Sequence, residues 1–132
     1  MQLVDTPGAK EYERLRPLSY VDAQVSLICF NIDDPQSMDR VKDNWNPEIR
    51  HFTGRSPVVL VACKIDLRND PETISKLKQR GEKPINTKTG KKLASEIHAD
   101  AYVECSARTH EGVQELFVTA AQLALKRKPS MR

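Results

Sequence analysis

The chain has 132 residues, 39% of them hydrophobic and 30% charged, and a formal net charge of +3. This length fits one domain, and the composition is ordinary for a globular protein. Much of the small positive charge lies in the last turn and tail (residues 126–132), and no basic stripe with interleaved aromatic residues is present, which argues against a nucleic-acid partner.

The three cysteines, Cys29, Cys63 and Cys105, each fall within or at the end of an apolar run, so we expect buried thiols. An odd number of cysteines without ligand spacing favours a reducing compartment over a disulfide framework or a zinc site. No apolar run approaches the roughly 18 residues of a membrane span, and the first residues do not resemble a signal peptide. We therefore expect a cytoplasmic protein.

Taken in chain order, the first predicted element is the end of a strand at residues 2–4. Asp5-Thr6-Pro7-Gly8 then turns the chain, and residues 9–24 are predicted to form a short polar helix or an irregular segment. Gly8 can place a bare backbone N–H against a phosphate, and Asp5 can reach a metal-bound water. An ordinary Pro-Gly turn would use the same residues, so both interpretations stay open at this point.

The next predicted pair is a strand at 25–32 and a helix at 34–53. Asp34 followed by Pro35 is typical of a helix start. The apolar residues then recur every three or four positions, which predicts one face packed on a sheet, with a kink at Pro47 and an end at Gly54. These apolar positions are Met38, Val41, Trp45, Ile49 and Phe52.

Residues 57–62 form a β-branched, apolar run that predicts a buried parallel strand, and Cys63-Lys64-Ile65-Asp66 follows it. Open α/β sheets bind ligands at the carboxyl ends of their strands. A carboxylate such as that of Asp66 can accept hydrogen bonds from two N–H groups of guanine, and the stem of Lys64 can lie over the ring. Alone, this pattern is equally compatible with a surface loop.

The remaining elements repeat the alternation of helix and strand. A polar helix is predicted within 69–81, outside the core, and Thr87 is predicted to cap a helix that buries Leu93, Ala94 and Ile97. A last strand at 102–105 precedes a strongly amphipathic helix at 113–124. Helical crossovers between apolar strands favour a parallel α/β sheet.

Three stretches now stand in a fixed order: residues 5–8, 63–66 and 104–107. They resemble the D-x-x-G, N/T-K-x-D and S-A-K motifs of Ras-like small GTPases. Residues 12–20 look like switch II of the Rho family, and residues from 66 onward resemble its insert. The resemblance covers essentially the whole chain. It implies a Ras-like P-loop NTPase fold, that is, an incomplete three-layer α/β structure with a mostly parallel sheet.

The domain organisation that the resemblance implies is a partial Rho-type GTPase domain at 1–127, with the insert at about 69–84 and a short basic tail at 128–132. The implied cofactors are GTP or GDP and Mg²⁺, and Asp5 would hold Mg²⁺ through water only if the full site exists. The implied nucleotide-binding residues are Gly8, Lys64, Asp66, Ser106, Ala107 and Arg108. Asp66 would read the guanine N1 and N2 hydrogens, and the Ala107 amide would donate to the guanine carbonyl.

The chain departs from the family pattern in four places. It contains no G-x-x-x-x-G-K-[ST] sequence, so we expect the first strand, the P-loop helix, switch I and the second strand to be missing. Ala9 stands where the family has the glutamine that orients the attacking water, so no catalytic residue is assigned and we expect no hydrolysis by this chain. Cys63 replaces the usual Asn or Thr. No C-terminal C-a-a-X cysteine is present, so no prenyl anchor is expected.

The resemblance also implies protein partners: exchange factors, activating proteins, dissociation inhibitors, and effectors such as kinases. Residues 34–53 and 69–84 would form surfaces for them. Three interpretations stay open, and whether the chain is an enzyme stays open with them. The first interpretation is a guanine-nucleotide switch. The second is a non-enzymatic pseudo-GTPase adaptor or decoy that binds Rho regulators or effectors. The third is a non-functional fragment.

Overall fold

The computed structural model describes residues 24–54 and 56–126. In these residues a parallel sheet of three strands forms in the order β1 (Ser26–Asn31), β2 (Val58–Cys63) and β3 (Ala101–Glu104). Ser26 pairs with Val58 and Val59 with Ala101, so β2 lies between the other two strands. The structure therefore confirms the α/β class and the parallel sheet predicted from the apolar runs, and the sheet is open and incomplete.

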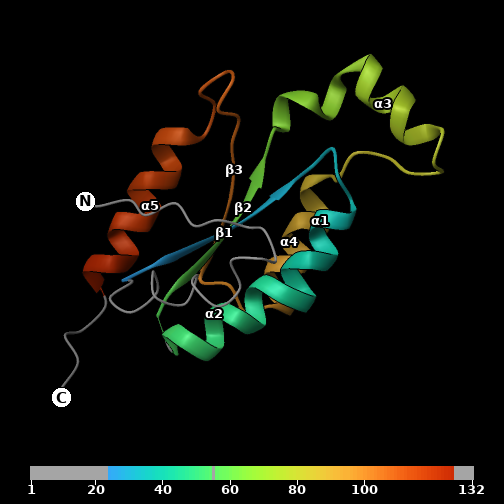
Figure 1. Ribbon diagram of the computed structural model, residues 1–132. Coiled ribbons are helices and arrows are strands. Elements are labelled where there is room, and N and C mark those ends of the chain that lie inside the picture. Colours follow the sequence, from blue (N-terminus) through green and yellow to red (C-terminus); the bar gives the residue numbers. More distant parts are fainter. Residues whose placement is uncertain (1–23, 55, 127–132) are drawn as a thin grey trace.

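Helical segments connect the strands and cover both faces of the sheet, which gives the three layers that were expected (Figure 1). One face is covered by α5, and α1, α2 and α4 lie on the other, while α3 projects beyond the sheet. The helical segments of the described residues are α1 (Gln36–Arg40), η3 (Val41–Trp45), α2 (Asn46–Thr53), η4 (Ile65–Asn69), α3 (Pro71–Lys78), α4 (Thr87–Glu96) and α5 (Val113–Lys126).

The core is divided by the sheet into two clusters, because successive side chains of a strand point to opposite faces. On the side of α1 and α4, Phe30 and Leu60 pack with Leu93. On the side of α5, Val61 and Val103 pack with Leu116. The central strand is buried on both faces, as its unbroken apolar sequence predicted.

The helix predicted at 34–53 is present, but its irregularity lies before Pro47. The segment Val41–Trp45 is a π-helical turn, in which the amide of Asn46 donates to the carbonyl of Val41. Proline has no N–H, so a regular i→i−4 hydrogen bond is lost at residue 47, and the wider turn lets Pro47 occupy the tolerated first turn of α2. The segment ends at Gly54, whose positive φ of 62° confirms the predicted stop.

Two local predictions were wrong. Asn86, rather than Thr87, caps α4, because its side-chain oxygen accepts from the Thr89 amide at 2.8 Å. Cys29 is exposed, whereas Cys105 is buried and Cys63 is half-buried. The alternation of β1 places Cys29 on the face opposite Ile28 and Phe30, so it lies outside the cluster that buries those two.

Several expectations fall on residues that lie outside the described ranges. These are the strand at 2–4, the turn at 5–8, the segment at 9–23 and the tail at 128–132. Within the described ranges, no helix has the length and apolar character that crossing a membrane requires.

Candidate functional site

The carboxyl ends of β2 and β3 bring two of the predicted site residues into contact. The Ser106 hydroxyl donates to Oδ1 of Asp66 at 2.7 Å, although 40 positions separate the two residues in the chain. Ser106 is completely buried. The second oxygen of Asp66, Oδ2, makes no hydrogen bond to the residues that the structure describes. The carboxylate is thus held by one oxygen and has the other available.

Lys64 turns the chain from β2 into η4. It has a left-handed backbone, with φ 63° and ψ 36°, which costs a non-glycine residue about 1–2 kcal/mol. Neighbouring hydrogen bonds hold this conformation: the Ile65 amide donates to the Cys105 carbonyl at 3.3 Å, and the Leu67 amide to the Lys64 carbonyl at 2.9 Å. The Lys64 side chain is exposed, so its stem is available to a planar ligand beside Asp66.

The loop after β3 presents Ala107 and Arg108 to solvent. It is closed from within, because the Ser106 amide donates to the Glu111 carbonyl at 2.9 Å and the Thr109 amide to Oγ of Ser106 at 3.1 Å. In the described part of the chain, the Ala107 amide has no hydrogen-bond acceptor. The loop therefore offers a backbone donor on the same edge of the sheet as the Asp66 acceptor.

A half-buried polar network lies directly beneath this edge, and the sequence reasoning missed it. Arg68 binds Glu104 with two hydrogen bonds, of 3.1 and 2.9 Å, and their side chains are only 23% and 20% exposed. Tyr102 donates to Glu104 at 2.7 Å, and Thr87 donates to it at 2.9 Å. Each Glu104 oxygen thus accepts from two donors.

The charge state of the network follows from these contacts. Burial by itself would raise the pKa of Glu104, but the hydrogen bonds from Arg68, Tyr102 and Thr87 outweigh it and lower that pKa. Burial, followed by the hydrogen bond to Glu104, raises the pKa of Tyr102. Near neutral pH the network therefore holds a carboxylate, a guanidinium and a protonated phenol.

Gly90 explains how Tyr102 reaches Glu104. A Cβ built on Gly90 would overlap the phenol oxygen and ring carbons of Tyr102. Glycine in the interior of a helix costs about 1 kcal/mol relative to alanine, and here it leaves room for the aromatic ring against the backbone of α4. A glycine within a helical pattern was the available sequence signal for such a close approach.

Cys63, the residue before Lys64, is in contact with both other cysteines. Its hydrogen bond with Cys29, together with burial, raises the pKa of the Cys63 thiol. Burial is the main cause that raises the pKa of Cys105, to about 11. Both thiols are therefore protonated at neutral pH, and thiols in that state are weak metal ligands and nucleophiles. Among the described residues, no group of three or more His, Cys, Asp or Glu side chains is arranged to hold a metal ion.

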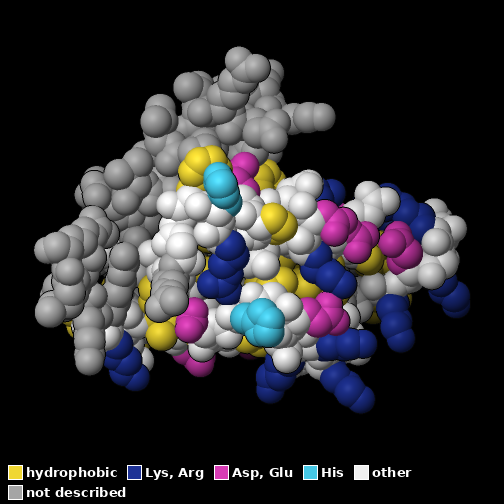
Figure 2. Space-filling model, turned by 90° about the horizontal axis from the view of Figure 1, so that it is seen from below, with side chains coloured by type: hydrophobic (Ala, Val, Ile, Leu, Met, Phe, Trp, Pro, Cys, Tyr) yellow, Lys and Arg dark blue, Asp and Glu magenta, His cyan; other side chains and the backbone are white. Residues whose placement is uncertain are grey.

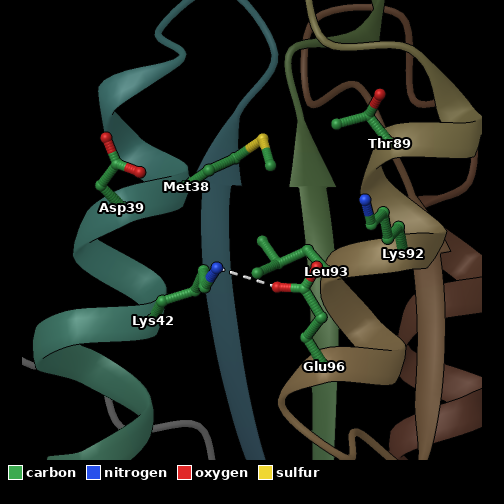
Figure 3. Close-up of a pocket in the computed structure, with 7 residues that line it drawn as sticks. All are labelled: Met38, Asp39, Lys42, Thr89, Lys92, Leu93 and Glu96. Atoms are coloured by element: carbon green, nitrogen blue, oxygen red, sulfur yellow. Dashed lines mark ion pairs between the residues drawn. The ribbon is translucent and has the colours of Figure 1, made fainter.

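A separate groove of about 180 Å³ lies between α1–η3 and α4, and no predicted nucleotide-binding residue lines it. Met38 and Leu93 contribute its apolar part, and the Lys42–Glu96 ion pair of 2.9 Å crosses it (Figure 3). The hydrogen bond between these two side chains raises the pKa of Lys42 and lowers that of Glu96. Unlike Asp66, the two charged groups that meet across this groove, Lys42 and Glu96, are exposed and already paired with each other.

The predicted residues Asp5, Gly8 and Ala9 lie outside the described ranges. Among the others, Asp66 and Ser106 are in direct contact, and Lys64, Ala107 and Arg108 flank them in the same two segments. The missed residues are Arg68, Glu104, Tyr102 and Gly90. The side chains of Arg68 and Glu104 meet across 36 positions of sequence, so spacing along the chain gave no indication of this contact.

Comparison with known proteins places the chain in a defined context. The model of the Ras family matches residues 1–126. The GTP-binding protein rho5 of Schizosaccharomyces pombe is 50% identical over 131 residues, covering 98% of this chain and 66% of the relative. The GTP-binding protein RHO1 of Saccharomyces cerevisiae is 48% identical over 128 residues (97% and 61%). The human Rho-related GTP-binding protein RhoB is 44% identical over 128 residues (97% and 65%). The chain thus spans slightly less than two thirds of the length of these relatives.

Proposed function

The chain belongs to the Ras family and its relatives are Rho-type GTP-binding proteins; from this premise we propose that it binds the guanine base of GTP or GDP at the carboxyl ends of β2 and β3. The observation that carries the proposal is the Asp66 carboxylate, fixed through Oδ1 by buried Ser106 at 2.7 Å and available through Oδ2.

The donor and acceptor pattern of guanine fits this edge. Guanine presents two neighbouring donors, N1–H and the 2-amino group, which a carboxylate can accept side by side. Its O6 is an acceptor, and the Ala107 amide is a donor without a partner in the described part of the chain. Adenine has an amino group in place of O6 and no N1–H, so it would leave Asp66 unpaired. Lys64 would cover the face of the ring, and Arg108 would shape the loop beside it.

We also propose that the chain contacts the phosphates and Mg²⁺, through residues that lie outside the described ranges. When bound, Mg²⁺ neutralises charge on the phosphates. Gly8 would contact the γ-phosphate and Asp5 would hold the metal through water, by resemblance to the family. Ala9 has neither a donor nor an acceptor with which to orient an attacking water. We therefore expect the 132-residue chain to hydrolyse GTP no faster than its Asp66→Ala variant, and faster turnover would contradict this.

Comparing nucleotides that differ only in the base tests the proposed binding of guanine. Binding of GMP, AMP and XMP to the chain would be measured by NMR titration, with equal phosphate in each ligand. Asp66→Asn should weaken GMP binding by about tenfold or more, because a charged acceptor for two donors is lost. It should also strengthen XMP binding, because the asparagine amide can donate to the 2-carbonyl of xanthine.

Asp70→Asn is the matched control, since Asp70 caps α3 through the Thr73 amide, a role that asparagine also fills. This control should bind all three ligands as the parent chain does. Equal binding of GMP and AMP by the parent, or unchanged GMP binding by Asp66→Asn, would contradict the proposal.

A second candidate is a non-enzymatic module for the regulators and effectors of Rho proteins: exchange factors, activating proteins, dissociation inhibitors or kinases. Ala9 favours it, and so does the exposed surface of the helices, where groups of both charges lie side by side (Figure 2). The groove at Lys42 and Glu96 and the segment 69–84 are the proposed contact regions. Pull-down with such regulators tests this function, and failure to retain any of them would contradict it.

A further inference from the structure

Two cross-links join the same two segments of chain. The first is the hydrogen bond from Ser106 to Asp66. The second is the ion pair of Arg68 with Glu104. Arg68 follows Asp66 by two positions and Glu104 precedes Ser106 by two, so the second link lies one step below the first on the same pair of segments.

The lower link is held from several directions. Arg68 also donates to the Ile85 carbonyl at 3.1 Å and to the Thr87 hydroxyl at 3.3 Å. Glu104 accepts from Tyr102 and Thr87 in addition to Arg68. Each carboxylate oxygen of Glu104 accepts hydrogen bonds from two donors, so the Arg68–Glu104 pair has little freedom to change its geometry.

The upper link has no comparable support on the side of Asp66. Asp66 lies in η4, a 3₁₀ segment of five residues that begins after the left-handed Lys64. Such segments have poorer internal hydrogen-bond geometry than an α-helix. The orientation of the Asp66 carboxylate therefore depends on the contacts that anchor η4 to β3, and Arg68 makes the two ion-paired contacts among them.

We propose that Arg68 and Glu104, supported by Tyr102, are positioning residues that align the Asp66 carboxylate and thereby set the preference for guanine over hypoxanthine. This inference rests on the proposed function. Hypoxanthine keeps N1–H and O6 but lacks the 2-amino group, so Asp66 would accept one hydrogen bond from hypoxanthine and two from guanine. The second guanine donor would use the remaining lone pair of Oδ1, whose other lone pair accepts from Ser106. That two-point contact requires alignment within about 0.5 Å, whereas a single hydrogen bond tolerates more.

The test compares GMP with IMP, which carry the same phosphate and differ in the 2-amino group. The ratio of their dissociation constants would be measured by NMR titration of the full 132-residue chain. One hydrogen bond to a charged group corresponds to a preference of about tenfold or more for GMP in the parent chain. Arg68→Gln removes the positive charge and should lower this ratio about three- to tenfold. Arg68→Lys keeps the charge but replaces a two-pronged donor with a point charge, so it should lower the ratio less.

Charge exchange provides the rescue. The double variant Arg68→Glu with Glu104→Arg restores an ion pair across the same segments, so its ratio should exceed that of either single variant. Tyr102→Phe leaves the ion pair intact and removes one hydrogen bond, so it keeps the test available if Arg68→Gln does not fold, and it should lower the ratio by about twofold. Lys76→Gln, which breaks the exposed ion pair with Glu72, is the control and should leave the ratio unchanged.

The outcomes separate this inference from the function on which it rests. A parent chain with no preference for GMP over AMP would contradict the proposed function. A parent chain with a clear GMP preference, together with Arg68→Gln or Tyr102→Phe variants that retain the full GMP/IMP ratio, would overturn the positioning role alone. A lowered ratio with charge-exchange rescue would support it, because a general loss of stability would weaken both ligands equally.

Discussion

The two ion pairs Arg68–Glu104 and Lys42–Glu96 have the same N···O distance, 2.9 Å, but very different surroundings. The first has side chains that are only 23% and 20% exposed, has two hydrogen bonds and shares its carboxylate with Tyr102 and Thr87. The second is 49% and 38% exposed and crosses a groove between two helices.

The N···O distance of an ion pair therefore does not by itself determine how much the pair stabilises the fold. An exposed pair is screened by water, and holding its two long side chains in place costs conformational entropy. A half-buried pair whose remaining positions are occupied by donors cannot lose one member without leaving the other poorly solvated. We therefore assign structural weight to the network under Asp66 and little to the pair in the groove.

The largest expected effect is that of Arg68→Gln. Removing the guanidinium leaves the half-buried Glu104 carboxylate without its ionic partner, which should lower the free energy of unfolding by about 2–4 kcal/mol. Urea denaturation at pH 7 measures it. If the free energy of unfolding changes by no more than the experimental error, the network stabilises the fold no more than an exposed ion pair does.

The next largest effect on stability is expected for Gly90→Ala, and its sign should be opposite to that usual for this substitution in a helix. Alanine normally stabilises a helix interior by about 1 kcal/mol relative to glycine. Here the added methyl would displace the Tyr102 phenol, so we expect destabilisation by about 1–3 kcal/mol. The same substitution in a Tyr102→Ala background removes the obstacle and should be stabilising. If Gly90→Ala is stabilising in both backgrounds, the close packing of Tyr102 against α4 is wrong.

The pH dependence of stability gives a smaller effect. The pKa of Glu104 is lowered in the folded chain, so its stabilising contribution is fully present above the ordinary glutamate pKa, about 4.3, and is lost as pH falls through the folded-state value. The parent chain should therefore exceed Glu104→Gln in stability at pH 7, and this advantage should shrink as the pH is lowered from 5 to 3. Urea midpoints at each pH measure it. A constant difference across that range would contradict the assignment.

The smallest expected effect is that of Lys42→Gln. Both side chains of this pair are exposed and screened, so the thermal midpoint should stay within experimental error of the parent. Adding 1 M salt should not alter the result. A large decrease in the midpoint would mean that the groove contributes to the fold as strongly as the network does.

The sequence predicted the elements whose signal is local. The apolar runs gave the strands that became β1, β2 and β3, and the spacing from Val113 gave α5. Gly54 marked a helix end correctly. The resemblance to Ras-like GTPases, rather than a local signal, assigned Asp66 and Ser106 to one nucleotide site. The structure places these two side chains in contact, and their binding of nucleotide stays a prediction.

What the sequence did not predict depends on neighbours that are distant in the chain. Glu104 was noted only as part of a motif, because its partner Arg68 lies 36 positions away. The exposure of Cys29 depends on which face of β1 is covered. The π-helical turn before Pro47 is one of several ways to accommodate a missing N–H, and composition does not choose among them.

The most direct test of the central claim is a map of backbone amide shifts on adding GMP to the isotopically labelled 132-residue chain. Guanine recognition at this edge predicts saturable shifts at Lys64–Asp66 and at the Ala107 amide, with the groove at Met38 and Leu93 unaffected. Shifts confined to the groove, or none at Ala107 under saturating GMP, would contradict guanine recognition at the carboxyl ends of β2 and β3.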